Sequence, residues 1–171
     1  MNVAILPQQV LLDGHDLLQL REASRFLAAF GPPSRQRTIP MHPRGTRVAM
    51  VWDTLGLVAY ADQPEGSMSH LHLAFIPEET PERPRQSGHP VIEINGGIVT
   101  AETSESTLPR KGPTPISEDH GKHFFHEAEH YHADFSFQRR PNPRGRELLV
   151  GGLEYFSFSW RDVPVESSAE R

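Results

Sequence analysis

Residues 130–138, HYHADFSFQ, alternate strictly between polar and apolar side chains. In an extended chain successive side chains point to opposite faces, so the apolar residues of this stretch share one face: Tyr131, Ala133, Phe135 and Phe137. Residues 153–161, LEYFSFSWR, repeat the pattern with Phe156, Phe158 and Trp160. Because alternation is typical of strands with one buried face, the two stretches predict an antiparallel hairpin. The arginine- and proline-rich residues 139–146 form its loop.

Further strands are predicted on both sides of one helical segment. Residues 3–12 are extended and end at the Asp13-Gly14 turn, and VIEINGGIV at 91–99 predicts a second hairpin. Residues 47–60 predict two strands around Asp53-Thr54, and SHLHLAFI at 69–76 predicts one more. Apolar residues recur every three or four positions from Leu17 to Phe30, which predicts a helix that Gly31-Pro32-Pro33 ends. Residues 34–46, 77–90 and 100–122 are predicted to be loops, and residues 124–128 leave room for only a short helical stretch.

The fold class that follows is α+β, an antiparallel twisted sheet with one principal amphipathic helix packed on it. Residues 1–171 form a single domain, with two similar halves at about 1–78 and 90–165 as the alternative organisation and a frayed tail at 166–171. We expect one core with the following members: Phe26, Leu27, Phe30, Trp52, Leu71, Leu73, Phe75, Phe135, Phe137, Phe156 and Phe158.

The composition of the sequence argues against several classes of function. The sequence contains no cysteine, which excludes disulfides and thiolate chemistry and fits a reducing compartment. The net charge is −5, with 17 basic and 22 acidic side chains, so nucleic-acid binding is disfavoured. No apolar run approaches the roughly 20 residues that span a bilayer, and the N-terminus lacks the features of a secretory signal. We therefore expect a cytoplasmic protein without a membrane partner or a cofactor.

One motif suggests metal chemistry. His126, Glu127 and His130 match H-E-x-x-H, which in zinc proteases places two imidazoles on one face of a helix beside a catalytic glutamate. Here His130 begins an alternating strand, and five of the 10 histidines of the chain crowd into residues 120–132. We therefore interpret the match as accidental and expect no metal site, with His126 and His130 as the ligands of the alternative, a histidine-rich metal-dependent hydrolase.

A second pair of histidines lies in the strand at residues 69–76. His70 and His72 are two residues apart and share the polar face, where they could chelate a metal or simply face solvent. The chain has no glycine-rich phosphate loop and no G-x-S-x-G elbow. No catalytic residue is predicted.

Two segments resemble a known family. One is the Asp13-Gly14 turn with the amphipathic helix ending in FGPP at Phe30–Pro33; the other is VWDTLGLVAY at Val51–Tyr60 with the strand Leu71–Phe75. Over residues 5–100 they resemble a family of small bacterial proteins encoded beside polymorphic or type VI secretion toxins. The resemblance implies an immunity protein, and it carries over no catalytic residue.

We therefore predict a non-enzymatic binding protein that neutralises a cognate, basic toxin domain by occluding its active site. A structural or regulatory interaction module is the other non-enzymatic alternative. An excess of acidic groups speeds the encounter with a basic partner, and loops vary without disturbing a sheet. The predicted partner-binding residues lie in the loop-rich part: Glu102, Glu105, Glu118, Asp119, His123, Glu127, Glu129 and Tyr131.

Overall fold

A computed structural model describes residues 1–41, 45–63, 66–77, 80–119, 123–141 and 147–162. Strands dominate it. The elements in chain order are β1 (Asn2–Leu6), β2 (Gln9–Leu12), β3 (His15–Asp16), the 3₁₀ helix η1 (Leu17–Leu20), α1 (Ala23–Phe30), β4 (Arg35–Pro40), β5 (Thr46–Trp52), η2 (Asp53–Leu55), β6 (Leu57–Ala61), β7 (Met68–Ala74), β8 (Val91–Ile94), β9 (Gly97–Val99), η3 (Glu105–Thr107), β10 (Ser117–Asp119), β11 (His123–Glu127), β12 (Tyr131–Pro141) and β13 (Glu147–Trp160).

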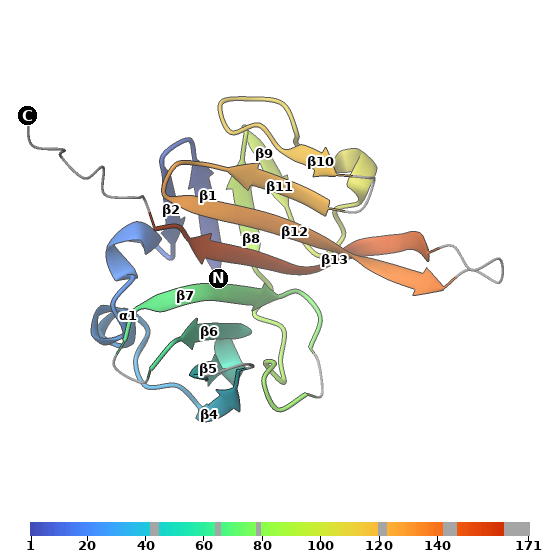
Figure 1. Cartoon of the computed structure of the whole chain (residues 1–171). Helices are drawn as coiled ribbons and strands as arrows, with labels where there is room; N and C mark the ends of the chain where they lie inside the picture. The colour runs from blue at the N-terminus through green and yellow to red at the C-terminus, as the bar shows by residue number, and fades with distance from the viewer. Residues whose placement is uncertain (42–44, 64–65, 78–79, 120–122, 142–146, 163–171) are drawn as a thin grey trace, which may run out of the picture.

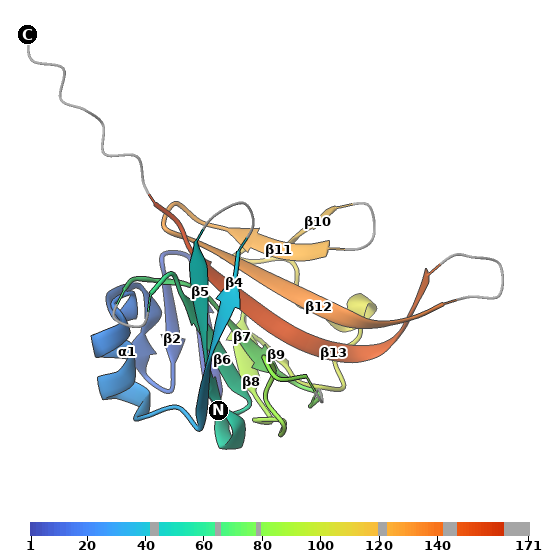
Figure 2. The ribbon, with the colours of Figure 1, turned by 60° about the horizontal axis from the view of Figure 1, so that its bottom comes forward.

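These strands form two sheets packed in layers (Figures 1 and 2). The small sheet has five strands in the order β3-β2-β1-β8-β9, and the large sheet has eight in the order β10-β11-β12-β13-β7-β6-β5-β4. All pairs are antiparallel except β1 with β8. In the view of Figure 1 the large sheet crosses in front of the small one, so its outer face is turned toward the reader.

One hydrophobic core lies between the layers and contains residues of both sheets and of α1. The expected core residues Leu27 and Phe30 are partly buried and pack against it; the other nine of the expected set are buried members. Alternation along β12 and β13 decides which side chains enter, because the apolar face of each strand points inward. Helix α1 docks at one end, where Phe26 meets Trp52 with ring centroids 5.5 Å apart.

The two ranges proposed as similar halves contribute similar series of strands. The first gives β1, β2 and β3 to the small sheet and the second gives the hairpin β8–β9; each gives a four-stranded meander to the large sheet, and the meanders meet where β7 pairs with β13. The turn that joins β2 to β3 matches the turn that joins β8 to β9. Asp13 and Asn95 both have positive φ, and each is followed by a glycine with positive φ. Such turns give the strand reversal of a two-residue hairpin. A repeat of two similar halves stays the alternative organisation of the single domain.

The predicted fold class fits the structure only loosely. The fold is mostly β, and two sheets replace the single sheet that was expected.

Several expected boundaries of helices, strands and loops were wrong. The helical segment is interrupted after Leu20, where Glu22 forms a β-bridge with Ser67 before α1 begins. Part of 34–46 is the strand β4, and 124–128 falls largely in the strand β11. β12 continues to Pro141, which shortens the expected loop, and the tail at 166–171 lies outside the described residues.

Candidate functional site

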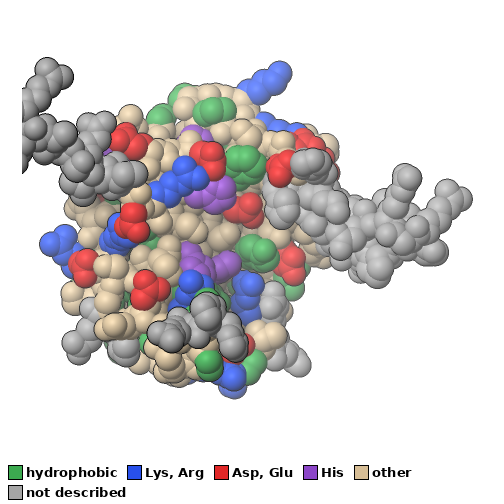
Figure 3. Space-filling view, in the orientation of Figure 1, with side chains coloured by type: hydrophobic (Ala, Val, Ile, Leu, Met, Phe, Trp, Pro, Cys, Tyr) green, Lys and Arg blue, Asp and Glu red, His purple; other side chains and the backbone are tan. Residues whose placement is uncertain are grey.

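The outer face of the large sheet gathers polar and aromatic side chains at its centre. The strand register places these side chains on neighbouring strands, all pointing away from the core. We call this set the histidine face: Tyr60 on β6, His70 and His72 on β7, Tyr155, Ser157 and Ser159 on β13, and His132 and Asp134 on β12. Figure 3 shows histidine side chains in two groups in the middle of this face.

Cross-strand pairing fixes the order of these groups. Ser157 on β13 lies opposite His72 on one side and Asp134 on the other. Strands are about 4.8 Å apart, so His72 and Asp134 are separated by about 10 Å. A serine-histidine-aspartate triad needs the histidine between the other two, bonded to both. Here the serine is central, so the row does not have the arrangement of a hydrolase triad.

The two histidines of β7 are held among aromatic rings. His70 stacks on Tyr60 with ring centroids 4.3 Å apart, and His72 meets Tyr155 edge-on at 5.4 Å. Burial, with smaller effects from Arg47 and Arg83, lowers the pKa of His70 to about 4. Burial, together with Arg83 and His70, lowers the pKa of His72 to about 3. Both imidazoles are therefore neutral at physiological pH, and neither is the open solvent-facing group expected from the sequence.

Arg83 reaches the histidine face from the loop at residues 80–90. Its guanidinium carbon lies 5.0 Å from the centroid of the Tyr155 ring, and its Nη1 is 3.5 Å from Nδ1 of His72. A cation over an aromatic face is attracted by the ring quadrupole. The loop thus adds a positive charge beside two neutral imidazoles.

An ion pair anchors this loop to the sheet. Arg35 on β4 makes two hydrogen bonds to the Asp53 carboxylate, at 3.0 and 2.9 Å. The same guanidinium donates to the carbonyls of Pro81 and Arg83, and Arg85 donates its backbone N–H to Asp53. The hydrogen bond from Arg35 is the main cause that lowers the pKa of Asp53.

A close backbone approach holds the far end of the loop. A Cβ at Gly88 would lie 1.9 Å from the carbonyl oxygen of Leu55, and one at Gly56 would lie 2.1 Å from the nitrogen of Gly88. Gly56 also has a φ of +63°, which only glycine adopts at little cost. These two contacts therefore require glycine at both positions.

The H-E-x-x-H residues do not form a zinc-protease site. His126 is only 5% exposed on the inner face of β11, where its Nδ1 donates to the carbonyl of Pro115 at 2.9 Å. Glu127 points to the outer face and binds Arg161 at 2.6 Å, and His130 is exposed in the turn before β12. A strand turns adjacent side chains to opposite faces, so the motif cannot converge. No cluster of three or more potential metal ligands occurs among the described residues.

We expect the purified protein to show no peptidase activity. A tag-free sample is assayed with a generic peptide substrate, and its metal content is measured in parallel. Glu127→Gln should leave the background rate unchanged, because Glu127 pairs with Arg161 rather than facing His126. Stoichiometric zinc together with loss of cleavage in Glu127→Gln would contradict this prediction.

The predicted partner-binding residues divide between the two ends of β11. At one end Glu105 and Glu118 both pair with Arg110, at 3.5 and 2.5 Å, and Asp119 is exposed on the edge strand β10. Glu127 and Glu129 are exposed at the other end. The remaining acidic residue of the set, Glu102, is exposed and accepts a hydrogen bond from Thr100 at 2.6 Å.

The two remaining members of the predicted set, Tyr131 and His123, lie in the strands β12 and β11. Tyr131 has no exposed surface, and its hydroxyl donates to the carbonyl of Leu6 at 2.7 Å, so its side chain belongs to the core rather than to a contact surface. The alternation of β12 turns it inward. His123 lies in β11, and its side chain is outside the described part of the structure.

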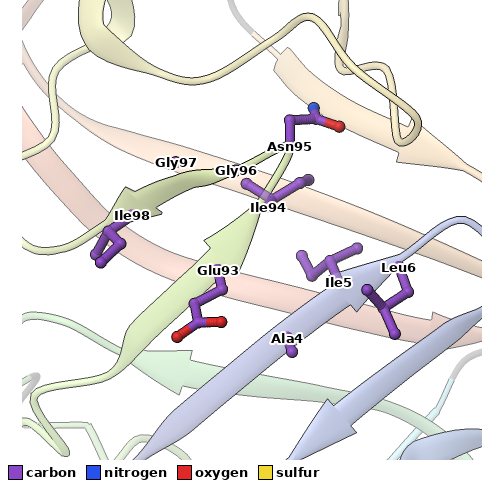
Figure 4. Close-up of a pocket in the computed structure, with 9 residues that line it drawn as sticks. All are labelled: Ala4, Ile5, Leu6, Glu93, Ile94, Asn95, Gly96, Gly97 and Ile98. Carbon is purple, nitrogen blue, oxygen red and sulfur yellow. The ribbon is translucent and has the colours of Figure 1, made fainter.

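A hollow lies on the small sheet, with a volume of about 320 Å³. It is lined by β1 and the β8–β9 hairpin, as Figure 4 shows. Leu6 and Ile98 stand at its margin, 44% and 63% exposed, and among the described residues that line it Glu93 is the only charged one. The hollow offers few polar groups that could orient a ligand, so it specifies the chemical class of a ligand less well than the histidine face does.

No protein-family model, curated protein or solved structure matches this chain. The resemblance to proteins encoded beside secretion toxins therefore stays a prediction. No helix of the described residues is long and apolar enough to cross a membrane.

Proposed function

We propose that this chain is a non-enzymatic binding protein that neutralises a cognate, basic toxin domain by covering the toxin's active site. The observation that carries the proposal is the histidine face. Its centre combines tyrosine rings and imidazoles on antiparallel strands with an arginine of the 80–90 loop, and the described residues leave it partly open to solvent. Aromatic residues and arginine are enriched at the centres of protein interfaces and supply most of their binding energy.

The charges around the face support a basic partner on one side. Arg37 and Arg47 lie toward the β4–β5 side, whereas Asp119 and Glu127 lie toward the β10–β11 side. Glu127 stands directly opposite His132 in the strand register, at the margin of the histidine face. Acidic rim groups speed encounter with a basic surface, and the buried centre then determines how long the complex lasts.

The rigidity of the large sheet also supports a role in binding, because the histidine face need not change shape when a partner docks. Each strand of the face is paired on both sides, so its side chains are held at fixed spacings. A preorganised surface loses little conformational entropy when a partner docks. This property favours tight one-to-one inhibition of a toxin.

We expect a toxin to be encoded beside this gene, and we expect co-expression of this chain with that toxin to rescue the host cells and to yield a complex that co-purifies. Ser157→Arg should abolish both effects, because it places a long charged side chain at the centre of the face. Ile98→Arg is the matched control, since it adds the same side chain to an exposed position on the small sheet. Loss of a hot-spot contact weakens binding by about 2 kcal/mol or more, or roughly 30-fold, and we expect at least this loss in Ser157→Arg.

Three outcomes separate the alternatives. Rescue that is lost in Ser157→Arg and kept in Ile98→Arg supports the proposal. Absence of both rescue and co-purification for the unchanged chain overturns it. A stable homo-oligomer that Ser157→Arg disrupts, without a toxin complex, indicates a structural interaction module instead.

A further inference from the structure

Two contacts fix the protonated nitrogen of His70. The hydroxyl of Ser69 lies 3.2 Å from the carbonyl oxygen of Tyr60 and 3.0 Å from Nδ1 of His70. A carbonyl only accepts, so the single hydroxyl proton of Ser69 is used at Tyr60. Both contacts are satisfied together only if Nδ1 of His70 donates to the Ser69 oxygen. Nε2 of His70 then carries a lone pair and acts as an acceptor.

The neighbouring imidazole has the opposite arrangement. Nη1 of Arg83 lies 3.5 Å from Nδ1 of His72, and a guanidinium has donors only. A proton on Nδ1 would face these donors and the positive charge, so the lone pair occupies Nδ1. Nε2 of His72 therefore carries the proton and acts as a donor.

Within the described part of the chain, both Nε2 atoms lack a hydrogen-bond partner. The two side chains are partly exposed, no described residue hydrogen-bonds to either Nε2, and neither atom is buried without a partner. The ring centroids are 5.3 Å apart, so one small planar group can reach both. Tyr60 and Tyr155 flank the pair.

We propose that His70 and His72 form a binding site for a primary carboxamide, the side chain of an asparagine or glutamine of the partner. A primary amide carries a donor N–H and an acceptor C=O on the same edge, which matches one acceptor beside one donor. A trans peptide group points its N–H and C=O in opposite directions, so it cannot bond both imidazoles from one edge. A carboxylate has only acceptors and would leave His70 without a partner.

This site adds a recognised side chain to the proposed function. It rests on that proposed function for the identity of the partner protein. Its recognition is uncharged, so the acidic rim steers the toxin domain while the imidazole pair selects one residue of it. A buried polar group that fits only one partner discriminates strongly, because the wrong group leaves hydrogen bonds unmade.

Four probes of nearly equal shape test the site on the purified protein. Benzamide carries the primary amide, N-methylbenzamide the secondary amide, benzoate the anion and benzamidinium the cation. Histidine ¹H–¹⁵N correlation spectra first identify the tautomers, with Nδ1–H expected at His70 and Nε2–H at His72. Benzamide should then shift both imidazole signals with a dissociation constant in the range of about 1–10 mM. The other three probes should bind about tenfold more weakly or not at all.

Two variants and one control locate the binding. His70→Phe and His72→Phe each keep a ring and remove one hydrogen bond, so each should weaken benzamide binding about tenfold. His132→Phe changes a histidine of the same face two strands away and should leave binding unchanged.

Affinity for benzamide should be constant between pH 8 and about pH 5.5, and fall below that as His70 and then His72 are protonated. The groups that face the pair are Tyr60 on β6, Tyr155, Ser157 and Ser159 on β13, Arg83 of the loop, and the charges of Arg47 and Asp62. Burial is the main reason that both imidazoles stay neutral over this range.

The outcomes are distinguishable from those of the toxin experiment, because no partner protein is present. Preferential binding of benzoate would show an anion site at Arg83 and would overturn the proposal. Equal binding of all four probes would show unspecific contact with the tyrosine rings and would also overturn it, as would an Nε2–H tautomer at both histidines.

Discussion

We expect Trp52→Ala to lose about 3–5 kcal/mol of unfolding free energy, the range typical of removing a buried aromatic side chain. Trp52 ends β5 and is 3% exposed. Its ring packs against Phe26 of α1, and its Nε1 donates to the carbonyl of Gly31 just after that helix, at 3.0 Å. The variant therefore loses the contact that docks α1 on the large sheet and leaves a carbonyl without its donor.

Urea unfolding followed by far-ultraviolet circular dichroism measures the loss, since the variant has lost one of the two tryptophans of the chain. Trp52→Phe is the matched control: it keeps most of the ring and removes the hydrogen bond, so it should cost about 1–2 kcal/mol. An unchanged unfolding midpoint in Trp52→Ala would show that α1 is not held to the sheet by this side chain.

The second large effect is expected at the ion pair that anchors the 80–90 loop. Asp53→Ala should lower the unfolding free energy by about 2–3 kcal/mol at pH 7, less than for a fully buried pair because both side chains keep some exposure. The side chains of Arg35 and Asp53 are 23% and 18% exposed. The variant also removes the acceptor of the Arg85 N–H, so Arg83 should leave its position over Tyr155.

The effect should depend on pH in one direction. The folded state lowers the pKa of Asp53, so its carboxylate stabilises the fold above its unfolded pKa of about 4. This contribution is lost as the pH falls through the lower folded pKa. The stabilities of the unchanged chain and of Asp53→Ala should therefore converge as the pH falls below about 4.

A neighbouring pair provides the control. Arg37 and Glu82 also join β4 to the loop, at 3.0 Å, but they are 50% and 31% exposed. Exposed pairs contribute about 0–1 kcal/mol, so Glu82→Ala should have little effect. A Glu82→Ala variant as unstable as Asp53→Ala would show that the loop responds to any loss of charge.

The sequence predicted the strands that have one apolar face. β7, β12 and β13 alternate clearly, and their inward residues are buried as expected. β4 could not be found in this way, because RQRTIP on the edge of the sheet packs few apolar side chains. The sequence pattern also did not predict the division into two sheets. That division depends on the pairing of β1 with β8, which lie about 90 positions apart in the chain.

The candidate site was predicted only in part. Alternation placed His70 and His72 on one polar face, and the structure shows them there. Their neighbours come from β6, β13 and the 80–90 loop, and only the long-range register brings Tyr155 and Arg83 to them. The buried position of Tyr131 was predicted correctly by alternation, and its inclusion in the contact surface was an error that the same pattern could have prevented.

The position of β13 in the large sheet has a consequence during synthesis of the chain. β13 is made after every other described strand, yet it lies between β7 and β12. Until residues 147–160 leave the ribosome, both β7 and β12 present an unpaired edge along strands with a strongly apolar face. Such edges recruit other strands, so aggregation competes with folding at these two positions until the last strand fills the gap.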